Sequence, residues 1–140
     1  MAEGTNQLRV RLVTPERILL DEMADAVELP SKTGYIEVLY GAAPLVSLLG
    51  AGDVTLHGGA SENKRYNVNW GFVEVLPDRV TILANDALLP SEIDTARAQK
   101  QVEHGQELWN QAGDSEEKYV EAERVINEGE AKLASAATRF

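Results

Sequence analysis

The side chains of this chain that could act as bases or metal ligands are few and scattered. His57 and His104 are its only imidazoles, and it has no cysteine. His57 falls in a predicted strand beside a turn and His104 on an exposed helical position, so we expect both to be ordinary surface histidines. The 23 carboxylates show no calcium-loop or other metal-ligand spacing. We therefore expect no metal, and an enzyme built on scattered carboxylates is the weakest function hypothesis.

One short segment, from Ile93 to Ala98, places an aspartate and an arginine one helical turn apart. Asp94 and Arg97 could simply form a local ion pair. In the functional interpretation, Arg97 offers a planar fork for phosphate oxygens, and Asp94 accepts from an exocyclic amine or a ribose hydroxyl. No GxxxxGK[ST] sequence is present, so a Walker-type phosphate site is excluded. The alternative function is therefore a nucleotide-responsive binding module rather than an NTP-hydrolysing enzyme.

The first part of the chain reads as a series of short strands. Every second residue from Leu8 to Leu12 is apolar, with arginines between them, which predicts a strand with one wet face. The clearest hairpin joins residues 72–75 and 80–83 across Pro77-Asp78. Turn residues recur about every ten positions, so we predict an all-β sandwich or flattened barrel of about ten short strands. The other expected runs are 17–20, 26–29 ending at Pro30, one that starts with Ile36 and Val38, 54–57 and 66–70.

The last part of the chain reads as two helices. All prolines lie at or before Pro90. Ser91 with Asp94 predicts one capped helix start, and Asp114 with Glu117, after Gly113, predicts a second. We therefore predict an N-terminal sandwich domain over 1–87 and a C-terminal antiparallel helical hairpin over 88–140. Apolar and small residues form the two expected seams: Ala98, Val102, Gly105, Trp109 and Ala112, then Tyr119, Ala122, Ile126, Gly129, Leu133, Ala136 and Phe140.

Alanine and glycine dominate these seams, so the hairpin buries few methylenes, and each interior glycine costs about 1 kcal/mol of helix propensity. Weak packing permits the hairpin to move, although a statically docked hairpin remains the alternative. The net charge of −10 disfavours nucleic acid and anionic membrane surfaces as partners. The polar N-terminus resembles no signal peptide, and no apolar stretch is long enough to span a bilayer. We expect a cytoplasmic setting and only indirect membrane association.

The order of the motifs resembles that of a known family, the epsilon subunits of bacterial rotary F-type ATP synthases, over essentially the whole chain. The motifs are Val13-Thr14-Pro15-Glu16, Leu29-Pro30, Gly34, Val38-Leu39, Gly41-Ala42-Ala43-Pro44-Leu45, Gly71-Phe72-Val73-Glu74-Val75, Val80-Thr81-Ile82-Leu83-Ala84, and Ile93-Asp94 followed by Arg97-Ala98.

The resemblance implies a noncatalytic central-stalk subunit that couples rotation of the proton-driven c-ring, through the gamma subunit, to ATP synthesis. It implies no cofactor beyond a regulatory ATP, and a peripheral position on the cytoplasmic face of the bacterial plasma membrane. The movable hairpin would inhibit ATP hydrolysis by transient contact with the alpha and beta catalytic subunits. The implied c-ring interface is Ser31, Lys32, Thr33 and Gly34, and the implied gamma interface is Gly41, Ala42, Ala43 and Pro44. Asp94 and Arg97 match the motif through which some members bind regulatory ATP.

The chain also departs from the family pattern. Its Tyr40-Gly41-Ala42-Ala43-Pro44 run has a methyl group at Ala42 where the family usually has an imidazole. Leu88 replaces an acidic residue, and Glu128 and Lys132 stand where nucleotide-binding members have arginines. A carboxylate facing a triphosphate repels it. Residues 115–140 hold more Glu than Lys and Arg, so we expect weak ATP sensing and weak electrostatic inhibition.

Overall fold

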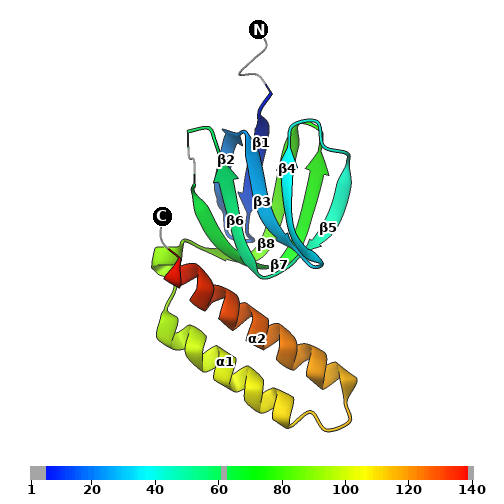
Figure 1. Ribbon diagram of the computed structural model, residues 1–140, viewed down its shortest axis with the longest axis vertical. Coiled ribbons are helices and arrows are strands. Elements are labelled where there is room, and N and C mark those ends of the chain that lie inside the picture. The colour runs from blue at the N-terminus through cyan, green and yellow to red at the C-terminus, as the bar shows by residue number, and fades with distance from the viewer. Residues whose placement is uncertain (1–5, 61–62, 139–140) are drawn as a thin grey trace. The chain divides into compact units, whose positions relative to one another are not determined.

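The computed structural model describes residues 6–60 and 63–138. They form two compact units that divide between Leu88 and Leu89, called unit 1 and unit 2. Unit 1 is built of strands and unit 2 of helices, as predicted (Figure 1). The strands are β1 (Leu8–Val13), β2 (Ile18–Ala24), β3 (Ala26–Ser31), β4 (Gly34–Leu39), β5 (Leu45–Leu49), β6 (Gly52–His57), β7 (Arg65–Leu76) and β8 (Arg79–Leu88). Unit 2 holds a short 3-10 turn, η1 (Pro90–Glu92), and the helices α1 (Thr95–Asn110) and α2 (Glu116–Ala137).

The strands hydrogen-bond in the order β2-β1-β8-β7-β5-β3-β4, and β6 pairs with both β3 and β7. Strands β7 and β3 are therefore bridged twice, once through β5 and once through β6, and Figure 1 shows the strands wrapped into a sandwich around a common interior. The interior is filled by the aliphatic residues of alternating strand positions. Its largest fully buried side chains are Leu8, Leu12, Leu29, Leu56, Ile82, Val10, Val27, Val54, Val68, Val73 and Val80.

Strand β7 is the longest and belongs to both layers. Its first half pairs with β6, from Arg65 opposite Thr55 to Val68 opposite Gly52. Its second half pairs with β5, beginning with Gly71 opposite Leu49. The two runs predicted on either side of Gly71 are therefore one bent strand. This is one reason why the described residues form eight strands and not about ten.

The predicted hairpin across Pro77-Asp78 is confirmed, with Val73 opposite Ile82 and Val75 opposite Val80. The structure differs from the sequence prediction at β3 and β5. Strand β3 does not end at Pro30 but continues to Ser31, because at this point its neighbour is the β5–β6 turn, where the Gly50 N–H donates to the Pro30 carbonyl at 2.8 Å. The proline supplies the acceptor that is needed, so its missing N–H breaks no ladder bond. Strand β5 was not predicted.

Unit 2 is an antiparallel helical hairpin in which the small seam residues allow close contact. A Cβ at Gly105 would stand 2.6 Å from Cγ1 of Ile126 and 3.1 Å from its backbone nitrogen. At the hairpin turn the Trp109 and Tyr119 rings pack edge to face, 4.7 Å between centroids, and the Tyr119 hydroxyl donates to the Gly113 carbonyl at 2.9 Å. Phe140, the last predicted seam residue, lies outside the described residues.

Both predicted helix starts are shifted. Residue Asp94, not Ser91, is the N-cap of α1, and its carboxylate accepts from the Arg97 backbone N–H at 3.1 Å. The stretch before it forms η1, in which Glu92 accepts from the Leu89 N–H. Residue Ser115, not Asp114, caps α2 by accepting from the Lys118 N–H at 3.3 Å. Within the described residues, neither helix has the length and apolar character needed to cross a bilayer.

Candidate functional site

A row of apolar side chains crosses the outer face of unit 1. It is built of direct cross-strand partners: Leu48 of β5 lies opposite Phe72 of β7, and Phe72 lies opposite Leu83 of β8. Leu83 in turn lies opposite Val13 of β1, which lies opposite Ile18 of β2. Directly opposite residues on neighbouring strands share a face and touch. We call these five residues the outer stripe.

The outer stripe faces away from the core. Leu48, Phe72, Leu83 and Ile18 are 45–53% exposed, and Val13 is half-buried. Their chain neighbours Leu12, Leu49, Val73 and Ile82 are buried, as strand alternation requires. An apolar surface across five strands is unfavourable in water, and such surfaces are typical of binding sites.

Sequence analysis did not predict the outer stripe, although the sequence carries a signal for it. Each of the following strand segments contains one residue of the outer stripe and, next to it, a second apolar residue: Leu12-Val13, Leu48-Leu49, Phe72-Val73 and Ile82-Leu83. Two apolar neighbours on a strand point to opposite faces, so such pairs indicate that both faces are to be covered.

The two loops predicted as interfaces lie at opposite ends of β4. The Ser31–Gly34 turn precedes the strand, where the Ser31 hydroxyl donates to the Gly34 carbonyl and the Lys32 N–H donates to Leu48 at 3.0 Å. Lys32, Thr33 and Gly34 are exposed, whereas Ser31 is buried. The fold therefore does not bring the two loops together, and it presents each of them on its own.

The loop of Gly41, Ala42, Ala43 and Pro44 follows β4 and is exposed or half-buried. The Gly41 N–H donates to the Pro77 carbonyl at 2.7 Å, so this loop lies beside the β7–β8 turn. It leads directly into β5, whose Val46 is 69% exposed and whose Leu48 belongs to the outer stripe. The loop and the stripe are thus continuous along the chain.

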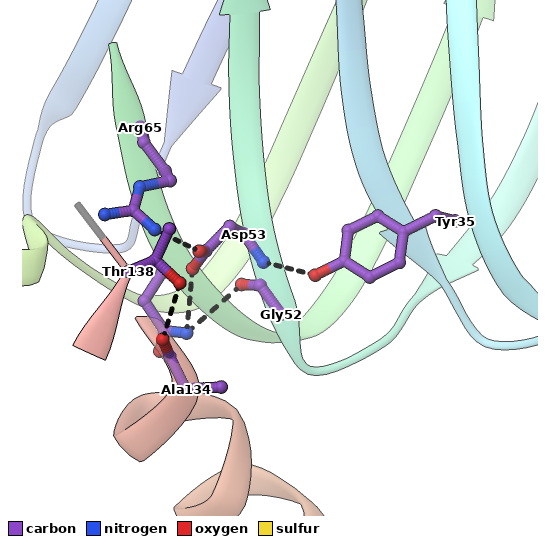
Figure 2. Close-up of polar contacts among 7 residues, drawn as sticks. Tyr35, Gly52, Asp53, Arg65, Ala134 and Thr138 are labelled. Atoms are coloured by element: carbon purple, nitrogen blue, oxygen red, sulfur yellow. Dashed lines mark hydrogen bonds and ion pairs between the residues drawn. The ribbon is translucent and has the colours of Figure 1, made fainter. Parts of the chain in front are cut away.

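A polar cluster joins β4, β6 and β7. The Asp53 carboxylate accepts from Arg65 at 3.1 Å and from the Asn67 amide at 3.2 Å, and its backbone N–H donates to the Tyr35 hydroxyl at 2.9 Å (Figure 2). Asn67 also donates to the Gly52 carbonyl at 3.3 Å. Partial burial raises the pKa of Tyr35. The Arg65 side chain is only 8% exposed, so its ion pair with Asp53, which links β7 to β6, offsets the desolvation of a charge.

The two residues predicted to bind a regulatory nucleotide, Asp94 and Arg97, lie at the start of α1. Asp94 directs its carboxylate to the helix backbone, and Arg97 is exposed one turn further on. In α2, Arg124 is held between Glu121 and Glu128, at 2.6 and 2.7 Å. These carboxylates raise the pKa of Arg124, and Arg124 lowers the pKa of Glu121. Glu128 thus forms an ion pair within its own helix. The charge of Arg124 is neutralised by Glu128 together with Glu121.

The histidines are on the surface of the described chain. His57 Nε2 lies 3.6 Å from a Glu28 carboxylate oxygen of the neighbouring strand, and its side chain is 40% exposed. His104 is exposed on α1. Neither histidine lies beside a hydroxyl or thiol in a described contact, so the geometry offers no nucleophile and base pair.

Comparison with known proteins agrees with this fold. Residues 7–90 match the family described as "ATP synthase, Delta/Epsilon chain, beta-sandwich domain". The ATP synthase epsilon chain of Solibacter usitatus is 41% identical over 131 residues, which cover 92% of this chain and 95% of that protein. The ATP synthase epsilon chain of Koribacter versatilis is 46% identical over 91 residues, 64% of this chain and 62% of the relative.

Two solved structures share the fold. A chain of the mitochondrial ATP synthase of Euglena gracilis superposes with a TM-score of 0.77 at 21% identity, covering 93% of this chain and 81% of its own length. A chain of the Tetrahymena thermophila mitochondrial ATP synthase central stalk and c-ring gives 0.69 at 12% identity, covering 93% and 96%. Because the family match covers more than half of the chain and the Solibacter relative nearly all of it, this chain belongs to the ATP synthase delta/epsilon family, as a noncatalytic subunit of the epsilon type.

Proposed function

We propose that this chain is the epsilon-type rotor subunit of a proton-translocating ATP synthase, which it joins on the cytoplasmic face of the bacterial plasma membrane as a peripheral component. It transmits rotation of the c-ring, through the gamma subunit, to ATP synthesis in the catalytic subunits. Its membership of the epsilon-type family and its rigid sandwich with exposed loops at both ends of β4 support this role. A module of this kind can hold two partners at once.

The outer stripe is the observation that carries the proposal. Together with the loop from Gly41 to Pro44, it forms the proposed gamma interface. Covering this apolar surface is favourable at about 25 cal/mol per Å² removed from water, which suits a partner that stays bound through many turns. The loop of Ser31, Lys32, Thr33 and Gly34, at the other end of β4, is the proposed c-ring interface.

The gamma interface is tested by binding to the purified cognate gamma subunit. The native chain should form a complex at micromolar concentration, and Leu83→Asp should weaken it at least about tenfold, because a charge would be desolvated at a hot spot of the interface. Leu83 is half exposed, so this substitution leaves the folded chain soluble. Val120→Asp is the matched control, since Val120 is 62% exposed on the hairpin. No complex with the native chain would reject the proposed function.

The c-ring interface is tested by cross-linking in the assembled complex. The chain has no cysteine, so a cysteine introduced at Thr33 is unique. Thr33→Cys should cross-link to the ring. Asp78→Cys, in the β7–β8 turn beside Gly41, should not. Equal cross-linking of both variants would contradict the assignment of the two ends.

The hairpin is proposed to move and to act on ATP hydrolysis through transient contact with the alpha and beta subunits. Its α2 helix is rich in glutamate, and Arg124 is neutralised by two of these residues. We therefore propose that any inhibition is modest. Complexes that carry the full chain and a chain ending at Leu89 should differ less than about tenfold in hydrolysis rate, and a larger release on truncation would contradict the modest role.

The alternative is ATP sensing through Asp94 and Arg97. Calorimetry of the full chain with ATP distinguishes it: heat that disappears in Arg97→Ala supports a nucleotide site. The engagement of Asp94 as a helix cap and of Arg124 with Glu128 leads us to expect no heat at micromolar ATP.

A further inference from the structure

Trp70 combines two features that the sandwich itself does not require. Its backbone has φ of +52° in the middle of strand β7, and its side chain is 60% exposed. A bulky residue is disfavoured in this left-handed region, because its Cβ crowds a carbonyl oxygen. A large exposed aromatic ring is likewise unfavourable in water.

The left-handed backbone has a clear structural origin. Trp70 lies where β7 leaves its partner β6 and joins β5, so the strand must bend there. The β7–β8 register passes directly from the Asn69–Asp86 pair to the Gly71–Ala84 pair. At Gly71, with φ of +149°, a side chain would collide with the Leu83 carbonyl oxygen, so glycine is required at this position.

The bend of β7 does not explain why the residue at position 70 is a tryptophan. Glycine or asparagine adopts a left-handed backbone more readily than tryptophan, so the bend explains the conformation but not the indole. The ring does not fill the core either, since most of it is exposed. Backbone strain that persists under an exposed aromatic ring points to a function outside the fold.

The position of Trp70 indicates what that function is. In the second half of β7 the exposed residues alternate with buried ones: Trp70, Phe72 and Glu74 are exposed, while Gly71, Val73 and Val75 are buried. Phe72 belongs to the outer stripe. Trp70 therefore extends the stripe along β7 by one position on the same side of the sheet.

We propose that Trp70 is the aromatic anchor of the gamma interface: its ring enters an apolar pocket of the gamma subunit, and its indole N–H donates to an acceptor at the rim of that pocket. Tryptophan is enriched among the few residues that dominate binding energy, because it combines a large apolar area with one polar group. The bend fixes the direction of the Trp70 Cα–Cβ bond before binding, so less conformational freedom of the backbone is lost on association. This inference rests on the proposed function.

The first test separates binding from stability. Trp70→Gly and Trp70→Asn relieve the left-handed strain, so the sandwich should melt at the same or a higher temperature, while affinity for the purified gamma subunit falls at least about tenfold. If Trp70 had a purely structural role, both substitutions would lower the melting temperature and leave the affinity for the gamma subunit unchanged. A lowered melting temperature with unchanged affinity would therefore overturn the inference.

The second test measures the fluorescence of Trp70 in a chain whose proposed gamma interface is unchanged. The chain has two tryptophans, so Trp109→Phe, on the hairpin, leaves Trp70 as the only tryptophan of this chain. Its fluorescence should shift to shorter wavelength when gamma is added, because the ring leaves water. If the native chain binds gamma but the Trp70 emission does not shift, the anchor is wrong and the proposed function stands. If the native chain does not bind gamma at all, both the anchor role of Trp70 and the proposed function are rejected.

Discussion

Gly129 of α2 lies so close to Val102 of α1 that a Cβ on the glycine would stand 2.8 Å from Val102 Cγ2 and 3.3 Å from the Val102 backbone nitrogen. The carbonyl oxygen of Ala98 would be 3.2 Å away. Two of these three neighbours are backbone atoms, and the third belongs to a stiff β-branched side chain. The glycine thus sets the distance between the helices, and alanine at this position would push them apart.

Gly129→Ala should destabilise the hairpin even though alanine is the better helix former. The gain in propensity is about 1 kcal/mol, whereas overpacking a tight contact costs about 1–3 kcal/mol. Amide hydrogen exchange in α1 and α2 of the full chain should therefore become faster. Glu130→Ala is the matched control, because Glu130 is exposed and gains only propensity. Slower exchange in Gly129→Ala would show that the helices have room for a methyl group.

Gly71→Ala should strongly destabilise the sandwich. Its Cβ would collide with the Leu83 carbonyl oxygen in the centre of the sheet, and we expect a loss of more than about 2 kcal/mol in the free energy of unfolding. Gly34→Ala separates collision from backbone strain. Gly34 also has positive φ, +134°, yet a Cβ added there would meet no described atom within 4 Å. Chemical denaturation of both variants measures the difference, and equal losses would attribute the effect to φ alone.

Asp94→Ala should loosen the first turn of α1. The Asp94 carboxylate accepts from the Arg97 N–H, and loss of such a cap costs about 1 kcal/mol. Asp94→Asn keeps the acceptor and should behave like the native chain. Hydrogen exchange at the Arg97 amide reports the result directly. Unchanged protection in Asp94→Ala would mean that the cap contributes nothing.

Stability of the sandwich should fall at acid pH partly through Asp21. Its hydrogen bond with Arg9, at 2.8 Å, lowers the pKa of Asp21, and the same contact raises the pKa of Arg9. The pKa of Asp21 in the folded chain therefore lies below its value of about 3.9 in the unfolded chain. The ion pair stabilises the fold fully at pH values above the unfolded pKa, and this stabilisation is lost as the pH falls through the folded pKa. Asp21→Asn should therefore be less stable than the native chain at pH 6 but not near pH 2.

The exposed position of this pair provides a second check on the same substitution. Ion pairs in water are screened by salt. The difference between the native chain and Asp21→Asn at pH 6 should shrink as the salt concentration rises. A difference that is independent of both pH and salt would mean that Asp21 stabilises the sandwich through packing and not through its charge.

A chain that ends at Leu89 should still fold. The sandwich is a compact unit with its own core, and every strand pair of that unit lies within residues 8–88. We expect cooperative melting of the truncated chain and normal binding to gamma, because the outer stripe is retained. Loss of cooperative melting would show that the sandwich needs the helices.

The sequence by itself determined the fold class, the paired helices, the β7–β8 hairpin and the family. These are carried by periodicity, turn residues and ordered motifs, which act over a few neighbouring residues. The helix starts were misplaced because Ser91, Asp94, Asp114 and Ser115 are all acceptable caps, and only the backbone conformation selects between them. Strand β5 was missed because Leu45–Leu49 has no apolar-polar alternation.

Only the tertiary structure decided which surfaces are available. The outer stripe draws its five residues from five different strands. They become neighbours through strand register, which depends on contacts across the sheet. The same is true of Trp70, whose type is visible in the sequence but whose strained backbone exists because β7 changes partners there. Local patterns fix how each segment folds, whereas long-range pairing decides which side chains remain exposed together.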